Sequence, residues 1–469
     1  MKKSTFLASV VTILLCFSLI AGSTFALFTS ETSVDIEVDA GRVAIKAGLT
    51  TPTLYSVEKD PAGTEYDENG KTYTYVEQKD TFANGGTAVL DEDGVISLTN
   101  VTPGDKIAFQ LTGANTSDVK VQYRYKIEVI SGYDLMNGFI ATVEGVKYPA
   151  MASYTSAWND LAIKENIPAA ELALELPVSA GNDYQMLDAK IKLSVEAVQW
   201  NADTTDTDAI SVKYITKVAN KAELETKILS DEYLHIFVDG DITDTVIISE
   251  SLENKTIDAN NHDVRLQFGT GADKRITVEN VSVQNLKAPT LTIKSGVSGD
   301  ITIRNSEFVS SESKVLNGGG DAQRLDLLSV TLENCTFDGG KNQVYFYHLA
   351  NLVIRGCTFK NSSSWAVLIN GSQGTYVRGN IVVSDSTFDT CTGILKGGVN
   401  GGNGTGSLSG NFTFANNKMN SCVKKEANTN KGDFVFIYMP VIEGALTFSN
   451  NTVNDIIVKV EDMGKLGSN

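Results

Sequence analysis

Val330-Thr331-Leu332-Glu333-Asn334-Cys335-Thr336-Phe337 is the stretch that decides the fold of the C-terminal half. Apolar residues alternate with polar ones, Asn follows, and a large apolar side chain stands three places later. Copies begin at residues 276, 301, 330, 352, 381, 412 and 446, at intervals of 22 to 34 residues. Intervals of this size are typical of one turn of a parallel β-helix. The sequence therefore predicts a stacked β-solenoid.

Each repeated position has a physical role in such a solenoid. The alternating apolar residues point into a stacked core, and rungs repeat at roughly 4.8 Å. The last residue of each copy tolerates a left-handed bend and can hydrogen-bond locally. The predicted bend ladder is Asn280, Asn305, Asn334, Gly356, Asp385, Asn416 and Asn450. The predicted core ladder is Phe308, Phe337, Phe359, Phe388, Met419 and Val453.

Outward positions fit the same register. The residues before the bends form a column of alternating charge, Glu279, Arg304, Glu333 and Arg355, which suits neighbours one rung apart. The alignment also stacks Cys335 on Cys357 and Cys391 on Cys422. In an exported protein either pair could form a disulfide. Stacked free thiols fit equally, and we favour them slightly.

The repeats resemble the right-handed parallel β-helix of pectate-lyase-like proteins over roughly residues 215–465, and residues 252–262 look like its opening rung. A short amphipathic helix with Asn220 as N-cap is expected to close the open end. The resemblance implies clustered acids in enzymes of this fold, but the alignment shows no such cluster, and we expect no catalytic residue. The aromatic residues Tyr345, Tyr347, Trp365 and Tyr438 are the candidate carbohydrate contacts.

The N-terminus has the features of a secretory signal: Lys2 and Lys3, then an apolar run, then small residues. Gly22-Ser23-Thr24-Phe25-Ala26-Leu27-Phe28-Thr29, followed by a short strand that ends in Ala40-Gly41, resembles the processing site of the TasA/camelysin family, whose members need a dedicated signal peptidase. The resemblance implies cleavage near Thr24, Ala26 and Leu27. It also implies a freed N-terminal strand that completes a neighbour's sheet during fibre assembly, with Val34, Ile36 and Val38 as its apolar residues.

The region between leader and repeats alternates at period two, as half-buried strands do. Residues 121–129 and 191–198 are examples, and turns such as Asn100–Asp105 separate the runs. The fold class is therefore all-β: an antiparallel, jelly-roll-like β-sandwich before a right-handed parallel β-helix. We expect a signal peptide at 1–26, a TasA/camelysin-like sandwich at 27–205, a linker at 206–216 and the β-helix at 217–465.

The functional expectation is a secreted or cell-surface structural or adhesive protein, a matrix or fibre component without catalysis. The alternative is a carbohydrate-binding or polysaccharide-degrading β-helix protein. The net charge of −18 argues against nucleic acid, because phosphate binding needs a basic surface. The expected partners are a dedicated signal peptidase, further copies of the chain and an extracellular polysaccharide. No cofactor or metal is expected.

Overall fold

The computed structural model describes residues 30–32, 43–59, 65–66, 72–202, 209–271, 274–319, 327–371, 375–399, 407–427, 434–439 and 441–466. The chain is all-β, an antiparallel β-sandwich followed by a right-handed parallel β-helix with a short capping helix. It divides into two compact units, Met1–Ile215 and Thr216–Asn469. The predicted fold class is confirmed.

Two antiparallel sheets form the sandwich, and their strands alternate buried and exposed residues, as the period-two pattern predicts. The first sheet, S1, has the order β11 (Val146–Pro149), β10 (Ile140–Val143), β14 (Asn166–Glu175), β8 (Asp105–Asn115), β3 (Thr53–Lys59), β5 (Thr72–Gln78) and β4 (Glu65–Tyr66), with β2 (Ile45–Leu49) on β8. The second sheet, S2, contains β1 (Ser30–Thr32), β6 (Thr87–Leu90), β7 (Val95–Thr99), β9 (Val121–Ser131), β12 (Met151–Thr155), β13 (Asn159–Leu161), β15 (Ala189–Gln199) and β16 (Ser211–Val218). Short helical turns lie at α2 (Tyr133–Met136), Val178–Ala180 and Asn182–Tyr184.

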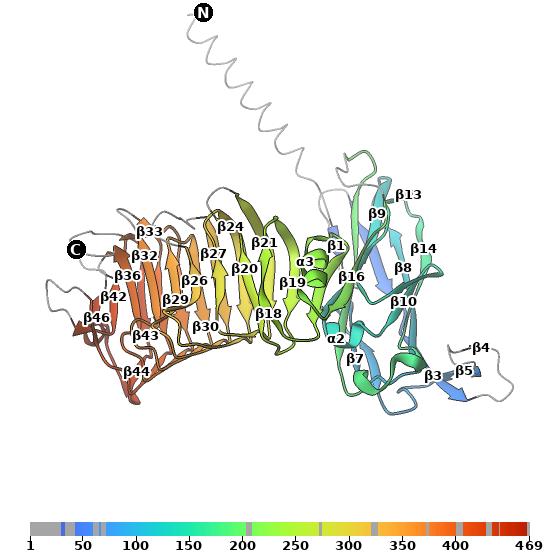
Figure 1. Cartoon of the computed structure of the whole chain (residues 1–469). Helices are drawn as coiled ribbons and strands as arrows, with labels where there is room; N and C mark the ends of the chain where they lie inside the picture. The colour runs from blue at the N-terminus through green and yellow to red at the C-terminus, as the bar shows by residue number, and fades with distance from the viewer. Residues whose placement is uncertain are drawn as a thin grey trace, which may run out of the picture. The chain divides into compact units, whose positions relative to one another are not determined.

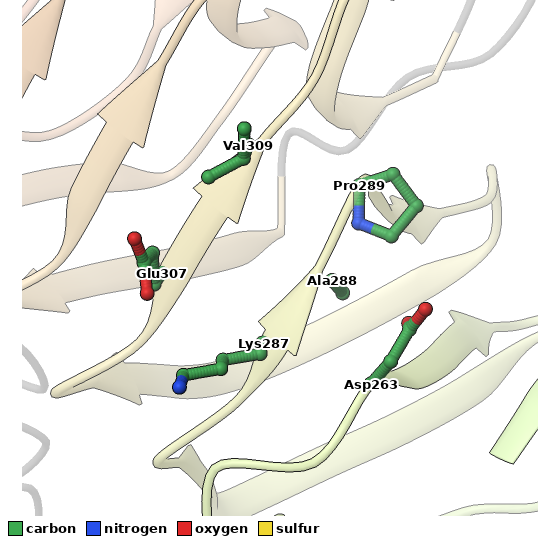
Figure 2. A pocket seen from close by; sticks show the side chains of 6 residues that line it. All are labelled: Asp263, Lys287, Ala288, Pro289, Glu307 and Val309. Atoms are coloured by element: carbon green, nitrogen blue, oxygen red, sulfur yellow. The ribbon is translucent and has the colours of Figure 1, made fainter. Parts of the chain in front are cut away.

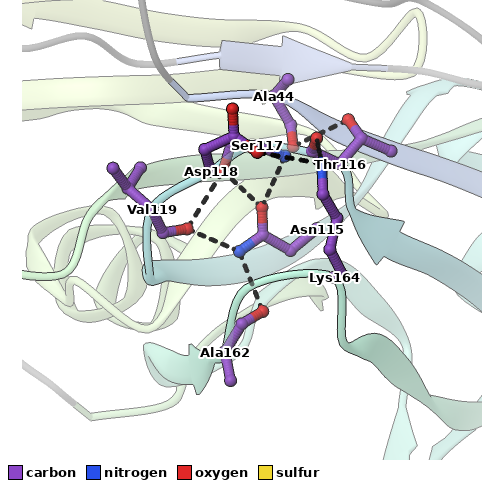
Figure 3. A network of polar contacts seen from close by, with 8 residues as sticks. All are labelled: Ala44, Asn115, Thr116, Ser117, Asp118, Val119, Ala162 and Lys164. Carbon is purple, nitrogen blue, oxygen red and sulfur yellow. Dashed lines mark hydrogen bonds and ion pairs between the residues drawn. The ribbon is translucent and has the colours of Figure 1, made fainter.

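A buried amide fixes the end of β8 (Figure 3). The Nδ2 of Asn115 donates to the carbonyls of Val119 at 2.8 Å and Ala162 at 2.9 Å, and its Oδ1 accepts from the backbone N–H of Ser117 at 3.0 Å. One side chain thereby joins the β8–β9 turn to the segment before β14. Leaving such an amide unpaired inside the sandwich would cost about 1–3 kcal/mol.

The Pro-Gly-Asp turn holds a buried carboxylate. Asp105 accepts from the Ser56 hydroxyl at 2.7 Å and from the backbone N–H of Thr102 at 2.8 Å. The turn therefore holds β8 against β3.

The segment from residue 211 to residue 216, which the sequence suggested to be linker, belongs to strand β16. Residues 211–214 of this strand pair with β12. Its valine and tyrosine side chains suit a half-buried strand.

Three parallel sheets make up the β-helix (Figure 1). Sheet I is β17 (Tyr233–Val238), β19 (Leu252–Asp258), β21 (Ile276–Gln284), β24 (Val297–Arg304), β27 (Leu328–Glu333), β30 (Asn351–Arg355), β34 (Ile381–Ser384), β38 (Phe412–Ala415) and β43 (Leu446–Ser449). Sheet II is β22 (Lys287–Ala288), β25 (Glu307–Val309), β28 (Thr336–Asp338), β31 (Thr358–Lys360), β35 (Thr387–Asp389), β39 (Lys418–Asn420) and β44 (Thr452–Val453), ending in the antiparallel β45 (Ile456–Ile457).

Sheet III is β18 (Ile242–Ile248), β20 (Val264–Phe268), β23 (Leu291–Ile293), β26 (Lys314–Gly318), β29 (Asn342–Tyr347), β32 (Val367–Gly371), β36 (Leu395–Val399), β42 (Ile437–Met439) and β46 (Gly464–Leu466). The smaller elements of this unit are β33 (Thr375–Val377), β37 (Ser407–Leu408), β40 (Lys425–Glu426), β41 (Phe434–Val435) and α4 (Val460–Met463). Each regular turn runs from sheet I through a tight bend to sheet II, then to sheet III.

The centre of the solenoid is a stack of phenylalanines from sheet II. The rings of Phe308, Phe337, Phe359 and Phe388 follow one another at centroid distances of 4.9, 5.1 and 4.9 Å, with planes within 9°. Met419 and Val453 pair in register above Phe388. The predicted core ladder thus lies in one column, because inward side chains one rung apart must stack.

The bends between sheets I and II adopt left-handed backbone. Asn305, Asn334, Asp385, Asn416 and Asn450 have φ between 50° and 57°, and Gly356 has φ 61°. Amide side chains link successive rungs: the Nδ2 of Asn416 donates to Asp385 Oδ1 at 3.0 Å, and the Nδ2 of Asn450 donates to Asn416 Oδ1 at 3.3 Å. These residues satisfy each other while they turn the chain.

The first predicted copy is out of register. Gln284, not Glu279, pairs with Arg304, and Asn285 (φ 53°) stands where Asn280 was predicted in the bend ladder. Strand β21 contains two apolar-x-apolar units with a register shift between Val278 and Val281, so the sequence pattern fits twice. Asn280 instead donates through Nδ2 to Asn254 Oδ1 at 2.7 Å in a separate bend.

Cys335 and Cys357 belong to a buried column just after the bends between sheets I and II, whereas Cys391 and Cys422 follow the left-handed Thr390 and Ser421 at the next bends, and Cys422 is only partly buried. The backbone N–H of Cys335 donates to Cys357 Sγ at 3.4 Å, and that of Cys357 donates to Ser386 Oγ at 3.1 Å. Further along the column, the backbone N–H of Ser386 donates to Asn417 Oδ1 at 3.0 Å, and that of Asn417 donates to Asn451 Oδ1 at 2.9 Å. All four described cysteines are free thiols.

The predicted cap is helix α3 (Lys221–Leu229). Asn220 Oδ1 accepts from the Glu223 backbone N–H at 3.0 Å, and Glu223 Oε2 accepts from the Ala219 backbone N–H at 2.8 Å. Leu224 and Ile228 are buried in the core of the solenoid. A helix of this kind covers apolar surface that an open end would expose.

Candidate functional site

The outer face of sheet II carries a column of charged side chains at its N-terminal end. Asp263 pairs in parallel register with Lys287, Lys287 with Glu307, and Glu307 with Thr336. Neighbouring strands lie about 4.8 Å apart, so Asp263 and Glu307, two rungs apart, have Cα atoms about 10 Å from each other. The register therefore brings two acids to one face with a lysine between them.

These acids line one pocket (Figure 2). Its volume is about 240 Å³, and its lining is Asp263, Lys287, Ala288, Pro289, Glu307 and Val309. Figure 2 shows Asp263 and Glu307 on either side of Ala288. The Ala288 side chain faces the core, in register with Phe308, and Val309, which is 61% exposed, supplies an apolar wall.

A second hollow of about 510 Å³ adjoins the first and shares Lys287 and Glu307 with it. Amides, hydroxyls and an amine complete its lining: Asn261, Asn305, Ser306, Asn334, Thr336 and Lys360, with Leu286. The two hollows form a polar strip across several rungs. Such a strip offers hydrogen-bond donors and acceptors at regular spacing to an extended polar ligand.

The neighbours of Asp263 fix its position. Arg265 Nη2 lies 3.8 Å from Asp263 Oδ2, and the backbone N–H of Asp263 donates to Asp241 Oδ1 at 3.0 Å. That hydrogen bond, and a second from His262 at 3.2 Å, hold the pKa of Asp241 below its usual range. The Oδ1 of Asp263 is buried and has no hydrogen-bond partner.

The separation of the two acids has a chemical meaning. Inverting glycoside hydrolases hold two carboxyl groups about 6.5–9.5 Å apart, because a water molecule must fit beside the sugar ring. Residues two rungs apart in a β-helix can meet this separation by small side-chain rotations. The expectation of no acidic cluster did not anticipate that the fold brings Asp263 and Glu307 to one pocket. The expectation of no catalytic residue stays a prediction.

The aromatic candidates lie elsewhere and are not an exposed platform. Tyr345, Tyr347 and Trp365 are each only 4% exposed. Tyr345 receives a hydrogen bond from Asn370 Nδ2 at 3.2 Å and has Lys314 Nζ 3.7 Å from its ring centroid. Tyr345 and Trp365 form a cluster with Leu368, Ala427 and Val435, and Tyr438 packs against it. Tyr345, Tyr347 and Trp365 therefore do not form the exposed surface that was predicted for carbohydrate contact, and residues in and beside the β40–β41 hairpin cover Tyr345 and Trp365.

Several predicted features fall outside the described residues: Thr24, Ala26 and Leu27 at the leader, and Val34, Ile36 and Val38 in the donor strand. Of the donor segment the structure describes Ser30–Thr32, which pairs with β15 of the same chain. Within the described ranges there is no group of three metal-ligating side chains, and no helix there is long and apolar enough to cross a membrane.

No protein-family model matches the chain, and no curated protein matches it. Among solved structures it is similar to the catalytic domain of a GH87 alpha-1,3-glucanase in complex with nigerose, at 9% identity and TM-score 0.20, over 77% of this chain and 92% of that one. It is also similar to the catalytic unit of a thermostable GH87 alpha-1,3-glucanase from Streptomyces thermodiastaticus strain HF3-3, at 11% identity and TM-score 0.19, over 79% and 93% of the two chains.

These findings correct the main functional expectation. A non-catalytic structural or adhesive protein was expected, whereas the solved structures similar to this chain are named as catalytic domains or units of GH87 alpha-1,3-glucanases. The alternative expectation was a carbohydrate-binding or polysaccharide-degrading β-helix protein. Likeness at this level transfers neither substrate nor residue roles to this chain, and its function is inferred from the pocket of sheet II.

Proposed function

We propose that this protein acts on an extracellular polysaccharide at the pocket between Asp263 and Glu307, and that it hydrolyses glycosidic bonds there. The carrying observation is the register Asp263–Lys287–Glu307, which sets two carboxyl groups across one hollow. One carboxyl group would protonate the leaving oxygen while the other activates water. Their spacing predicts inversion at the anomeric carbon.

The other side chains of the pocket support sugar binding. Lys287 stands between the acids and can donate to ring or hydroxyl oxygens, and the exposed part of the Asp263 side chain can meet a hydroxyl. The hollow that contains Asn261, Asn305 and Thr336 extends the surface along the rungs. A polymer lying across sheet II would therefore meet polar groups on both sides of the acids.

Release of reducing ends from a panel of polysaccharides tests this proposal. Glu307→Gln and Asp263→Asn should each lower the rate at least 100-fold, because each removes one half of the acid–base pair. Glu279→Gln, an exposed acid on sheet I, is the matched control and should retain full activity. Undiminished turnover by the double variant would refute the assignment, and NMR of the first product should show the inverted anomer.

An extracellular location belongs to this proposal. The leader-like residues 1–26 support export, and the resemblance to the TasA/camelysin processing site supports a dedicated signal peptidase as partner. N-terminal sequencing of the exported protein should begin at Leu27. A chain that retains residues 1–26 would contradict this step.

A further inference from the structure

The β-sandwich has a groove of its own, far larger than the pocket of sheet II. It lies on the outer face of sheet S1 and has a volume of about 1100 Å³. Strands β5, β3, β8, β14 and β10 cross beneath it in that order, which at about 4.8 Å per strand spacing makes a surface about 19 Å across. That span suits a short oligomer.

Two alanines account for the hollow. Ala108 of β8 and Ala173 of β14 are direct neighbours across the sheet, and they are flanked in register by Thr53 of β3 and Thr142 of β10. The row on one side is Tyr55, Lys106 and Glu175, and the row on the other includes Gln110 and Glu171. Small side chains at the centre and long ones on both sides produce a trough across the strands.

An aromatic platform stands at one end of this trough. Lys106 Nζ lies 5.0 Å from the ring centroid of Tyr75 and 5.9 Å from that of Tyr55. The ammonium attracts the faces of both rings and so restrains them. Tyrosine presents a flat apolar surface with a polar tip, a combination suited to ligands that have both hydroxyl groups and C–H faces.

The charge of the trough selects among polar ligands. Lys106 and Lys147 are balanced by Glu171 and Glu175, so the lining carries no net charge. Hydroxyls and an amide from Thr50, Thr51, Thr53, Thr142 and Gln110 supply the remaining polar groups. A polyanion would meet two carboxylates there, whereas a neutral polyol would meet donors and acceptors alone.

We propose that this groove binds a neutral, hydroxyl-rich oligosaccharide chain. Tyr55 and Tyr75 stack against the faces of the sugar rings. Lys106 donates hydrogen bonds to the hydroxyls of the oligosaccharide, the two glutamates accept from them, and Gln110 can do both. The site goes beyond the proposed function, because it lies in the sandwich and requires neither Asp263 nor Glu307. It would hold a neutral glycan without cleaving it.

Titration calorimetry on the full chain, with a panel of neutral oligosaccharides and with oligogalacturonate, tests the inference. Binding to at least one neutral ligand should weaken about tenfold in Tyr75→Ala and in Tyr55→Ala, as expected for the loss of one stacking contact. Ala108→Leu should abolish it by filling the trough. Because Ala108 is only half-buried and faces outward, this variant should keep its melting temperature.

Two controls separate the groove from the pocket. Lys190→Ala, an exposed residue on β15, and the double variant Asp263→Asn/Glu307→Gln should both bind as the parent does. Loss of binding in the double variant with retention in Ala108→Leu would overturn the groove and point to the pocket. Absence of binding to every neutral ligand, or stronger binding of oligogalacturonate, would also overturn it. Groove binding without any turnover would instead contradict only the hydrolytic proposal.

Discussion

Replacing Phe337 with Ala should show how much the aromatic stack contributes to the β-helix. Phe337 is fully buried and lies between Phe308 at 4.9 Å and Phe359 at 5.1 Å. Phe→Ala changes in cores cost about 3–5 kcal/mol. Two parallel ring contacts are lost as well, each worth about 0.5–1.5 kcal/mol, so we expect the upper end of the range, about 5 kcal/mol.

Phe337→Leu separates stacking from volume. Leucine keeps most of the buried apolar area but makes no ring contact, and it should cost about 2 kcal/mol. Phe434→Ala is the matched surface control, because Phe434 is 61% exposed and should change stability by less than about 0.5 kcal/mol.

Urea unfolding followed by circular dichroism, with amide hydrogen exchange of residues 297–318 and 328–360, is the assay. Exchange is needed because solenoids can unfold in parts. We expect protection to fall first in the rungs of Phe308, Phe337 and Phe359. Equal losses in Phe337→Ala and Phe337→Leu, or a loss below about 1 kcal/mol in Phe337→Ala, would refute the stacking argument.

Three further predictions concern the polar columns. Asn416→Ala should lower the free energy of unfolding by about 2 kcal/mol, because Asn416 has φ 57° and hydrogen-bonds to the rungs on both sides. Asn416→Gly should restore the share of this loss that comes from backbone strain, because glycine adopts positive φ without strain. Cys357→Ser should cost less than about 1.5 kcal/mol, since Ser386 already occupies that column. Thiol titration of the parent should show that the buried Cys335, Cys357 and Cys391 react only after unfolding, whereas Cys422 is partly buried. Burial raises the pKa of Asp258, but the nearby His235 imidazole, at 3.7 Å, and hydrogen bonds from Gln284 and Asn285 outweigh it and lower the pKa overall. Its stabilising effect should therefore be present above pH 4 and vanish as the pH falls through the lowered pKa, so the stability gap to Asp258→Asn should close in acid; a gap constant from pH 7 to pH 2 would contradict this.

The repeated core was readable from the sequence because it is local. An apolar-x-apolar unit, a bend residue and a Phe lie within eight residues, and the stacking of rungs repeats that short pattern in space. The left-handed Asn305 and the Phe308 ring follow directly from it. The same locality explains the mistake at Asn280, since β21 contains the unit twice and only the pairing with β24 selects Asn285.

The aromatic cluster could not be read in this way. Tyr345 and Trp365 occupy outward positions, and outward aromatics suggest an exposed surface. Their cover includes Ala427 and Val435, about 80 residues after Tyr345 and beside a hairpin that departs from the repeat. Nothing in the local pattern around Tyr345 indicates that a distant hairpin folds over it. Exposure is a property of the assembled solenoid rather than of the rung.

Strand pairing brings the acids of the sheet II pocket together, although their unequal intervals in the sequence do not indicate it. Asp263, Lys287 and Glu307 are separated by 24 and 20 residues, whereas Glu307 and Thr336 on the next rung are separated by 29. The loops differ in length from rung to rung, so only the bend residue indicates which residues of neighbouring rungs lie side by side. Once Asn285 replaces Asn280 in the bend ladder, Lys287 and Glu307 both fall two places after their bends and must lie side by side. The error of five residues in one copy therefore hid the acid pair. A one-residue insertion between Asn285 and Lys287 would shift Lys287 out of register with Glu307. It should therefore disrupt the pocket while leaving the Phe stack from Phe308 onward in place.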